Sequence, residues 1–181
     1  SGYAPENTLA AVQKAIDLKA PYIEIDVHLS KDGEVIVIHD HTLERTTNGE
    51  GLVIDKELDE LKKLDAGSWF DNQFKGEPIP TLAEVIKLTK GKSILLIEVK
   101  KGDVYYDGIE GKIDKLIKKL DAVEWCEVQS FYDHFVEGFI SLNPPYKVHK
   151  LIVGKVPVLP IYFDHQWRFG NVLHWGNKVA G

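Results

Sequence analysis

Cysteine and methionine are almost absent from this 181-residue sequence, which contains one cysteine, Cys126, and no methionine. A single cysteine excludes an internal disulfide framework and a zinc site built from several thiolates. Long apolar runs are missing too: none approaches the ~20 residues that cross a bilayer, so we expect no transmembrane segment. No signal peptide is visible, and we therefore expect a cytoplasmic protein.

Basic residues are fewer than acidic residues in this sequence. Its 22 lysine and arginine residues face 28 aspartate and glutamate residues, which gives a formal net charge of -6. Such a balance makes nucleic-acid backbones and anionic membranes poor partners, so we expect no nucleic acid to bind. Acidic side chains can instead bind a divalent cation, which then attracts an anionic ligand. The composition carries no signal for an oligomeric state.

Short β-rich segments alternate with amphipathic segments along most of the chain. The pattern predicts strands at residues 22–29, 35–39, 93–99, 125–131 and 148–153. It predicts helices after Thr8, after Thr81 (with Glu84 completing a capping box), over residues 111–120 and around residues 135–142. Strands that are apolar on both faces are typical of a parallel sheet covered by helices. We therefore expect an α/β fold with parallel strands, in a single domain over residues 1–181.

Residues 42–80 break this alternation. They are rich in glycine, proline and asparagine, and only residues 56–64 form an amphipathic stretch. A segment of this length inside a compact domain is expected to have its own small structure or a function. Its aromatic residues Trp69, Phe70 and Phe74 could form a small core of their own or line an apolar groove.

Three carboxylates stand on predicted strands among apolar residues. Glu24 and Asp26 are two residues apart, so they share one face of their strand, and Glu98 ends another strand with Lys100 on its own face. An isolated strand-end acid is usually a solvated residue or an ion-pair partner. Adjacent buried carboxylates, however, repel each other and require a counter-charge. The joint pattern favours one divalent cation, and an all-oxygen ligand set favours Mg²⁺ or Ca²⁺.

His39 ends the second predicted strand. In a parallel barrel, strand ends of this kind face the active-site mouth, and histidine carries protons near neutral pH. A strand-end histidine that bonds a backbone carbonyl is an equally good interpretation of the position alone. His28 shares the strand face of Glu24 and Asp26, so it could line the mouth, although we expect it at the rim of the sheet, and we expect His41 in solvent. The other histidines show no spacing typical of a site: His134, His149, His165 and His174.

An ordered set of short motifs resembles the glycerophosphodiester phosphodiesterase family. Each motif is weak alone, but their order is specific and they extend over about residues 4–131. They are Ala4-Pro5-Glu6-Asn7-Thr8, Glu24-x-Asp26, Asp32-Gly33, His39-Asp40 followed by Leu43-x-Arg45-Thr46-Thr47-Asn48-Gly49, Pro80-Thr81-Leu82, Glu98-Val99-Lys100 and Ser130-Phe131.

The resemblance implies a TIM-type (β/α)8 barrel in which residues 42–80 are the family's small insertion. It implies Glu24, Asp26 and Glu98 as ligands of one divalent cation, Lys100 as a cation for the phosphate, and His39 as one of two acid/base histidines. The implied reaction is metal-dependent hydrolysis of a glycerophosphodiester, such as glycerophosphocholine, to glycerol 3-phosphate and an alcohol. In it, a neighbouring glycerol hydroxyl attacks and a cyclic phosphate is then opened by water.

The sequence departs from the family pattern in two places, one at each end of the expected barrel. The family's signature begins with a His-Arg pair on a strand just ahead of the position of Ala4, and this sequence starts after that pair. The family's last strands are not evident, whereas a barrel of this kind takes ~250 residues. We therefore expect a barrel that is incomplete at both ends.

Two other functions fit parts of the same pattern. A lysophospholipase D or sphingomyelinase D-like phosphodiesterase on this scaffold would use the aromatic residues of the insertion as an apolar groove. A non-catalytic binding module would keep the anion site and lack the first histidine.

Overall fold

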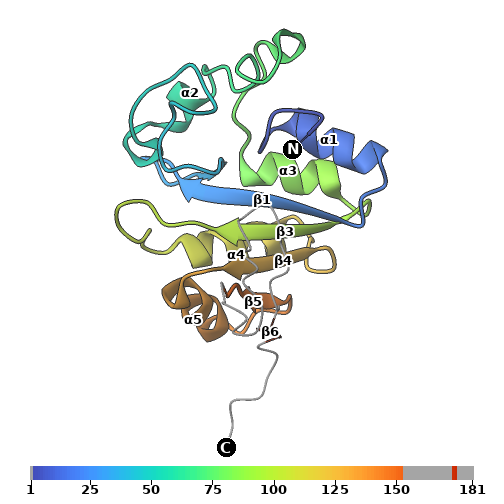
Figure 1. The fold of residues 1–181 in the computed structure, drawn as a ribbon. Coiled ribbons are helices and arrows are strands. Elements are labelled where there is room, and N and C mark those ends of the chain that lie inside the picture. The colour runs from blue at the N-terminus through green and yellow to red at the C-terminus, as the bar shows by residue number, and fades with distance from the viewer. Residues whose placement is uncertain (1, 153–172, 175–181) are drawn as a thin grey trace, which may run out of the picture.

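The computed structural model describes residues 2–152 and 173–174, which contain a single six-stranded sheet in the order β2-β1-β3-β4-β5-β6. Strands β1, β3, β4 and β5 pair in parallel, whereas β2 and β6 pair antiparallel at the two edges (Figure 1). The strands are β1 (Tyr22–Leu29), β2 (Val35–Val37), β3 (Ile94–Val99), β4 (Cys126–Ser130), β5 (Val148–Lys150) and β6 (Leu173–His174). The last predicted strand ends at Val153, outside the described residues.

In the described part of the chain, four helices of eight residues or more accompany the sheet: α1 (Leu9–Asp17), α3 (Leu82–Thr89), α4 (Ile109–Lys119) and α5 (Asp133–Ser141). Two of the predicted helix starts are confirmed. The Thr8 side chain accepts a hydrogen bond from the backbone N–H of Ala11, and Thr81 and Glu84 form the expected capping box. α4 begins two residues earlier than predicted, directly after Gly108, whose positive φ of 73° sets the turn into the helix.

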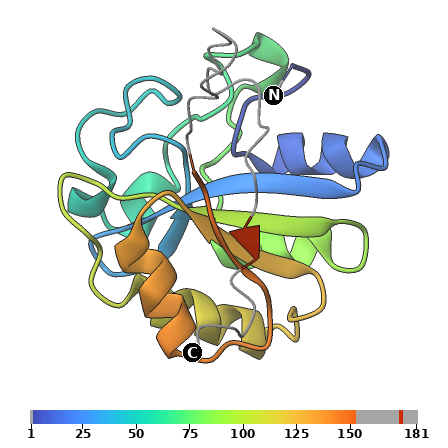
Figure 2. The same ribbon diagram turned by 60° about the horizontal axis from the view of Figure 1, so that its bottom comes forward.

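The helices and one face of the sheet form the main apolar core. In β1 this face consists of Ile23, Ile25, Val27 and Leu29, and β3 adds Leu95, Ile97 and Val99. Leu82, Val85 and Ile86 of α3 pack on it, as do Ile109, Ile113 and Ile117 of α4 and Phe135 and Phe139 of α5. Figures 1 and 2 show α1 and α3 together near β1 and α5 beside β4 and β5. The opposite face of the sheet is left for polar side chains.

The predicted orientation of β2 is wrong, because β2 runs antiparallel to β1, with Val27 opposite Val37. Only residues 30–34 connect the two strands, and a parallel crossover needs a dozen residues or more. Within this turn Gly33 has a φ of 80°, and its N–H donates to the carbonyl of Ser30. The short connection therefore makes β1 and β2 an antiparallel hairpin, even though both faces of β2 are buried.

The insertion at residues 42–80 packs with β2 around a second small core, which is aliphatic rather than aromatic. The cluster consists of Ile36, Ile38, Leu43, Val53, Leu61, Ala66 and Ile79. Short helices α2 (Leu58–Leu61), η1 (Val53–Asp55) and η2 (Asn72–Phe74) surround it. Trp69, Phe70 and Phe74 pack edge to face on one another outside this cluster, and Trp69 is 41% exposed. The three aromatic residues therefore pack on one another but are not part of the buried cluster.

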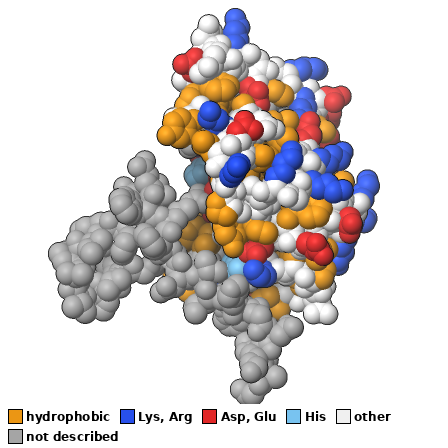
Figure 3. Space-filling view, turned by 90° about the vertical axis from the view of Figure 1, so that its right-hand side faces the viewer, with side chains coloured by type: hydrophobic (Ala, Val, Ile, Leu, Met, Phe, Trp, Pro, Cys, Tyr) orange, Lys and Arg blue, Asp and Glu red, His pale blue; other side chains and the backbone are white. Residues whose placement is uncertain are grey.

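The surface is mixed in charge. Figure 3 shows one side of the molecule, on which lysine and arginine side chains are interspersed with aspartate and glutamate side chains. Within the described residues, no helix combines the length and the apolar character that a membrane-spanning helix requires.

Candidate active site

Three carboxylates meet on the polar face of the sheet. β1 and β3 are parallel neighbours in a register that sets Asp26 directly beside Glu98, and Glu24 lies one side-chain repeat earlier on β1. Carboxylate oxygens of the three residues all lie within 4.8 Å of one another. Asp26 and Glu98 are each only 3% exposed, and Glu24 is half-buried. The predicted metal ligands are therefore brought together in space, and their role stays a prediction.

Lys100 supplies positive charge to this cluster. Its Nζ lies 2.6 Å from Oε1 of Glu98 and 3.2 Å from Oδ1 of Asp26. Burial alone would lower the pKa of Lys100, but the two carboxylates outweigh it and hold that pKa above its ordinary value of 10.5. The ammonium is therefore charged at neutral pH, and it partly offsets the repulsion between the carboxylates.

The donor atoms fit a hard divalent cation. Oδ1 of Asp26 and Oε1 of Glu98 are fully buried and accept no hydrogen bond of normal geometry, although Lys100 is within ion-pair distance of both. The second oxygen of Asp26 accepts from the side-chain amide of Asn7 at 3.0 Å. Asn7 thereby orients the carboxylate and leaves Oδ1 facing the cluster. Oxygen donors of this kind suit Mg²⁺ or Ca²⁺.

His39 lies in the loop after β2, two residues beyond Val37, rather than at the strand end that the sequence predicted. Its Nδ1 is 2.7 Å from Oδ1 of Asp40, and its Nε2 faces Nζ of Lys100 at 3.4 Å. An ammonium only donates hydrogen bonds, so Nε2 is the acceptor in that contact. The ring proton is then on Nδ1, where it is donated to Asp40. His39 thus presents a basic nitrogen toward Lys100.

Asp40 is itself held in place by Arg45. The Arg45 guanidinium donates to both oxygens of Asp40 at 2.6 and 3.0 Å, and also to Glu6 at 2.6 Å. Hydrogen bonds from Arg45, joined by one from His39, lower the pKa of Asp40 from 3.8 to about 2. The carboxylate therefore stays ionised and fixes the orientation of the imidazole.

His28 is not at the rim, as predicted, but fully buried under the His39 loop. Its Nε2 lies 3.0 Å from the backbone carbonyl of His39, and its Nδ1 lies 2.7 Å from the hydroxyl of Tyr106. Since a carbonyl only accepts, Nε2 carries the proton, and Nδ1 accepts from Tyr106. Burial lowers the pKa of His28 to about 4, so the ring is neutral near pH 7. His28 also lines the pocket, as one of its two sequence interpretations has it, whereas sequence reasoning missed Tyr106; together they tie this loop to β1 and to the segment after β3.

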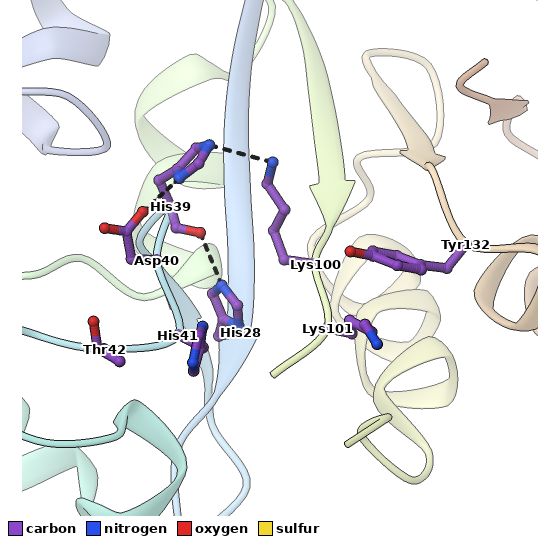
Figure 4. Close-up of a pocket in the computed structure, with 8 residues that line it drawn as sticks. All are labelled: His28, His39, Asp40, His41, Thr42, Lys100, Lys101 and Tyr132. Carbon is purple, nitrogen blue, oxygen red and sulfur yellow. Dashed lines mark hydrogen bonds and ion pairs between the residues drawn. The ribbon is translucent and has the colours of Figure 1, made fainter. Parts of the chain in front are cut away.

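A pocket of about 350 Å³ opens at the carboxyl ends of β1 and β3. Figure 4 shows His39 and Lys100 facing each other at one side, with Tyr132 and Lys101 at the other. Its lining residues are His28, His39, Asp40, His41, Thr42, Lys100, Lys101 and Tyr132. The aromatic residues of the insertion are not among them. Of the remaining histidines, His165 and the side chain of His174 lie outside the described residues.

Comparison with known proteins identifies similar chains. Residues 1–160 match the model of the glycerophosphoryl diester phosphodiesterase family. The chain is 48% identical over 145 residues to a glycerophosphodiester phosphodiesterase of Caldanaerobacter subterraneus subsp. tengcongensis, covering 80% of this chain and 60% of that protein. It is 42% identical over 169 residues to a glycerophosphodiester phosphodiesterase of Bacillus subtilis, covering 86% of this chain and 57% of that one.

Solved structures agree with the sequence matches. A glycerophosphodiester phosphodiesterase from Agrobacterium tumefaciens is similar at 39% identity and a TM-score of 0.73, over 81% of this chain and 61% of that chain. A phosphodiesterase from Oleispira antarctica, in complex with the product sn-glycerol-3-phosphate, is similar at 35% identity and a TM-score of 0.71. The match covers 82% of this chain and 61% of that chain.

The chain spans about 60% of the length of the relatives that it matches. The predicted α/β fold is confirmed as part of a TIM-type barrel, to which the described residues contribute the parallel strands β1, β3, β4 and β5. The predicted single domain over residues 1–181 includes residues outside the described part and stays a prediction. On the family match and these identities, the chain belongs to the glycerophosphoryl diester phosphodiesterase family.

Proposed function

We propose that the protein containing this chain hydrolyses glycerophosphodiesters to glycerol 3-phosphate and an alcohol. The observation that carries this proposal is a cluster of three carboxylates in contact with Lys100, which lines the pocket together with His39. Membership of the family supports the reaction class. The relative from Oleispira antarctica that was solved with sn-glycerol-3-phosphate supports the identity of the product.

One divalent cation, Mg²⁺ or Ca²⁺, would be held by Glu24, Asp26 and Glu98. When bound, such a cation offsets the negative charge of the phosphoryl oxygens. Three ionised carboxylates and the single ammonium of Lys100 leave a formal charge of −2 in the cluster, which a divalent cation balances. This match of charge supports the metal more strongly than the proximity of the acids alone.

Lys100 would bind the phosphate of the substrate at the pocket that it lines. Its ammonium has three donors, and charge on the phosphoryl oxygens increases as the attacking bond forms. Because ion pairs already hold Lys100, little reorientation is needed when substrate arrives.

His39 would transfer protons. Its Nε2 is unprotonated in the arrangement described above, so it can accept the proton of the attacking glycerol hydroxyl. The imidazolium formed in this way is stabilised by Asp40, which Arg45 keeps ionised. The family resemblance implies a second acid/base histidine on a strand ahead of the position of Ala4 and leaves open which of the two is the acid; with His39 as the base, the second would protonate the departing alkoxide.

The test is hydrolysis of glycerophosphocholine and glycerophosphoglycerol by the full-length protein, with release of glycerol 3-phosphate as the readout. We expect activity that EDTA abolishes and that added Mg²⁺ or Ca²⁺ restores, because charge compensation at the phosphoryl group depends on the cation. Activity that survives exhaustive chelation would contradict the metal requirement. Failure to hydrolyse either diester in the presence of both ions would contradict the proposed reaction.

A further inference from the structure

Lys101 occupies an unusual position at the wall of the pocket opposite His39. Its Nζ lies 5.5 Å from the ring centre of Tyr105 and 5.5 Å from that of Tyr132. Both distances are within the range of a cation–π interaction. Lys101 and Tyr132 both line the pocket (Figure 4). The lysine is therefore held on two aromatic rings at the surface that substrate would contact.

Lys101 and its neighbour Lys100 differ in how acidic side chains compensate their positive charges. Lys100 is neutralised by two carboxylates, whereas Lys101 takes part in no ion pair within residues 2–152. Asp103 is the acid nearest to Lys101 in sequence; its Oδ1 lies 3.5 Å from Nε2 of His41, and its side chain is 72% exposed. The wall formed by Lys101 and Tyr132 thus presents to a bound ligand an ammonium that pairs with no carboxylate of the described residues.

Two tyrosine rings in this arrangement would suit a quaternary ammonium group if their faces were open. Here the ammonium of Lys101 already interacts with both rings. A cationic group entering this part of the pocket would lose the ring faces and meet a like charge. Hydroxyl groups, in contrast, can accept hydrogen bonds from a lysine ammonium.

We propose that Lys101, positioned by Tyr105 and Tyr132, makes this site select diesters of uncharged polyols, such as glycerophosphoglycerol, over diesters of choline. The inference rests on the proposed function. The glycerol half of every such substrate is the same and is neutral, so a charged wall discriminates only through the other alcohol. Lys101 acts on the choice of substrate and takes no part in the proton transfers.

The experiment measures kcat/KM of the full-length protein, with its metal, for glycerophosphoglycerol and for glycerophosphocholine. The variants are Lys101→Met, which removes the charge, and Lys101→Arg, which keeps it. Lys115→Met is the matched control, because Lys115 is exposed on α4 and lies outside the pocket. A double variant, Lys101→Met with Tyr132→Leu, removes a ring as well.

The wild-type protein is expected to prefer glycerophosphoglycerol. Lys101→Met should lower this preference about 10-fold, mainly through faster turnover of the choline diester, because one close unit charge is removed and the rings are uncovered. Lys101→Arg and Lys115→Met should keep the wild-type ratio. The double variant should not show the faster turnover of glycerophosphocholine that is expected of Lys101→Met alone.

Three results would overturn the inference while leaving the proposed reaction intact. They are a wild-type preference for the choline diester, an unchanged ratio in Lys101→Met, and an equal loss on both substrates in Lys101→Met. If the wild-type protein hydrolyses neither diester, the proposed reaction itself fails, and the selectivity falls with it.

Discussion

At the scale of single residues, Lys100 sets the electrostatics of the site. Its ammonium joins the carboxylates of Asp26 and Glu98 to the imidazole of His39, through contacts of 3.2, 2.6 and 3.4 Å. One cation cannot balance three acids, and this residual negative charge is the physical reason to expect a divalent ion. The same contacts orient His39, whose Nε2 faces the ammonium while its Nδ1 donates to Asp40.

Replacing His39 by alanine tests its role as a proton carrier. We expect His39→Ala to lower kcat roughly 10²-fold or more, since general acid–base catalysis typically contributes that much. Metal affinity should stay close to that of the wild-type protein, because His39 is not one of the clustered carboxylates. The measurements are steady-state kinetics and titration with Mg²⁺. Full activity in the variant would refute the role.

At the scale of elements, the β1–β2 hairpin and the insertion form one unit that holds the His39 loop. The N–H of Leu58 donates to Asp32 in the hairpin turn at 3.1 Å, and the N–H of Lys31 donates to the carbonyl of Lys56 at 2.9 Å. Arg45, at the start of the insertion, bonds both Asp40 and Glu6. The insertion is thereby fastened to the hairpin and to the segment before α1, on either side of the candidate site.

The Arg45–Asp40 pair should make this unit sensitive to acid. The folded pKa of Asp40, about 2, lies below the ordinary value of 3.8, so its contribution to stability is present above about pH 4 and is lost as the pH falls toward 2. Arg45→Met removes the main cause of the shift. The free energy of unfolding should then be lower by up to ~1 kcal/mol near neutral pH, since both side chains are partly exposed, and should differ less from the wild type in acid.

Urea unfolding of both proteins at about pH 6 and about pH 3 checks this expectation. An Arg45→Lys variant is the matched control, because it keeps the charge and loses the two-pronged geometry, so it should lie between the other two. If the free energy of unfolding falls by the same amount between the two pH values in the wild type and in Arg45→Met, the Arg45–Asp40 pair does not stabilise the fold.

At the scale of the whole molecule, the two faces of the sheet have opposite characters. The face toward the helices is aliphatic, and the other face carries the carboxylate cluster and continues across β4 and β5 as a second polar group. There Glu127 lies 2.7 Å from His149 and 2.7 Å from Lys147. The helix-facing side supplies the burial that stabilises the domain, and the polar side supplies the site, at the cost of grouped charges.

A bound cation should therefore stabilise the full-length protein. At a free Mg²⁺ concentration of 100 times its Kd, we expect a gain of about 2.7 kcal/mol in the free energy of unfolding, measured by urea unfolding against EDTA-treated protein. Glu98→Gln should lose most of this gain. Glu137→Gln, an exposed position on α5, should keep it. Equal gains in the two variants would place the ion elsewhere.

Much of the fold could be predicted from sequence because its signals are local. The predicted bounds of β1 are those observed, and the capping box of α3 forms as its two residues indicate. The orientation of β2 is also decided locally, by the short turn at residues 30–34, although its apolar pattern alone is typical of a parallel strand. The burial of His28 is not a local signal, because its partner Tyr106 lies far along the chain.

The sequence by itself determined that Glu24 and Asp26 share a face, because successive side chains of a strand point to opposite sides. It also contained the ordered motifs of the family. Only the tertiary structure decided that Glu98 and Lys100 meet those acids, and that Lys101 lies on Tyr105 and Tyr132. Such contacts join residues on separate strands and loops. They depend on which strands become neighbours when the whole core packs, and no local pattern specifies that.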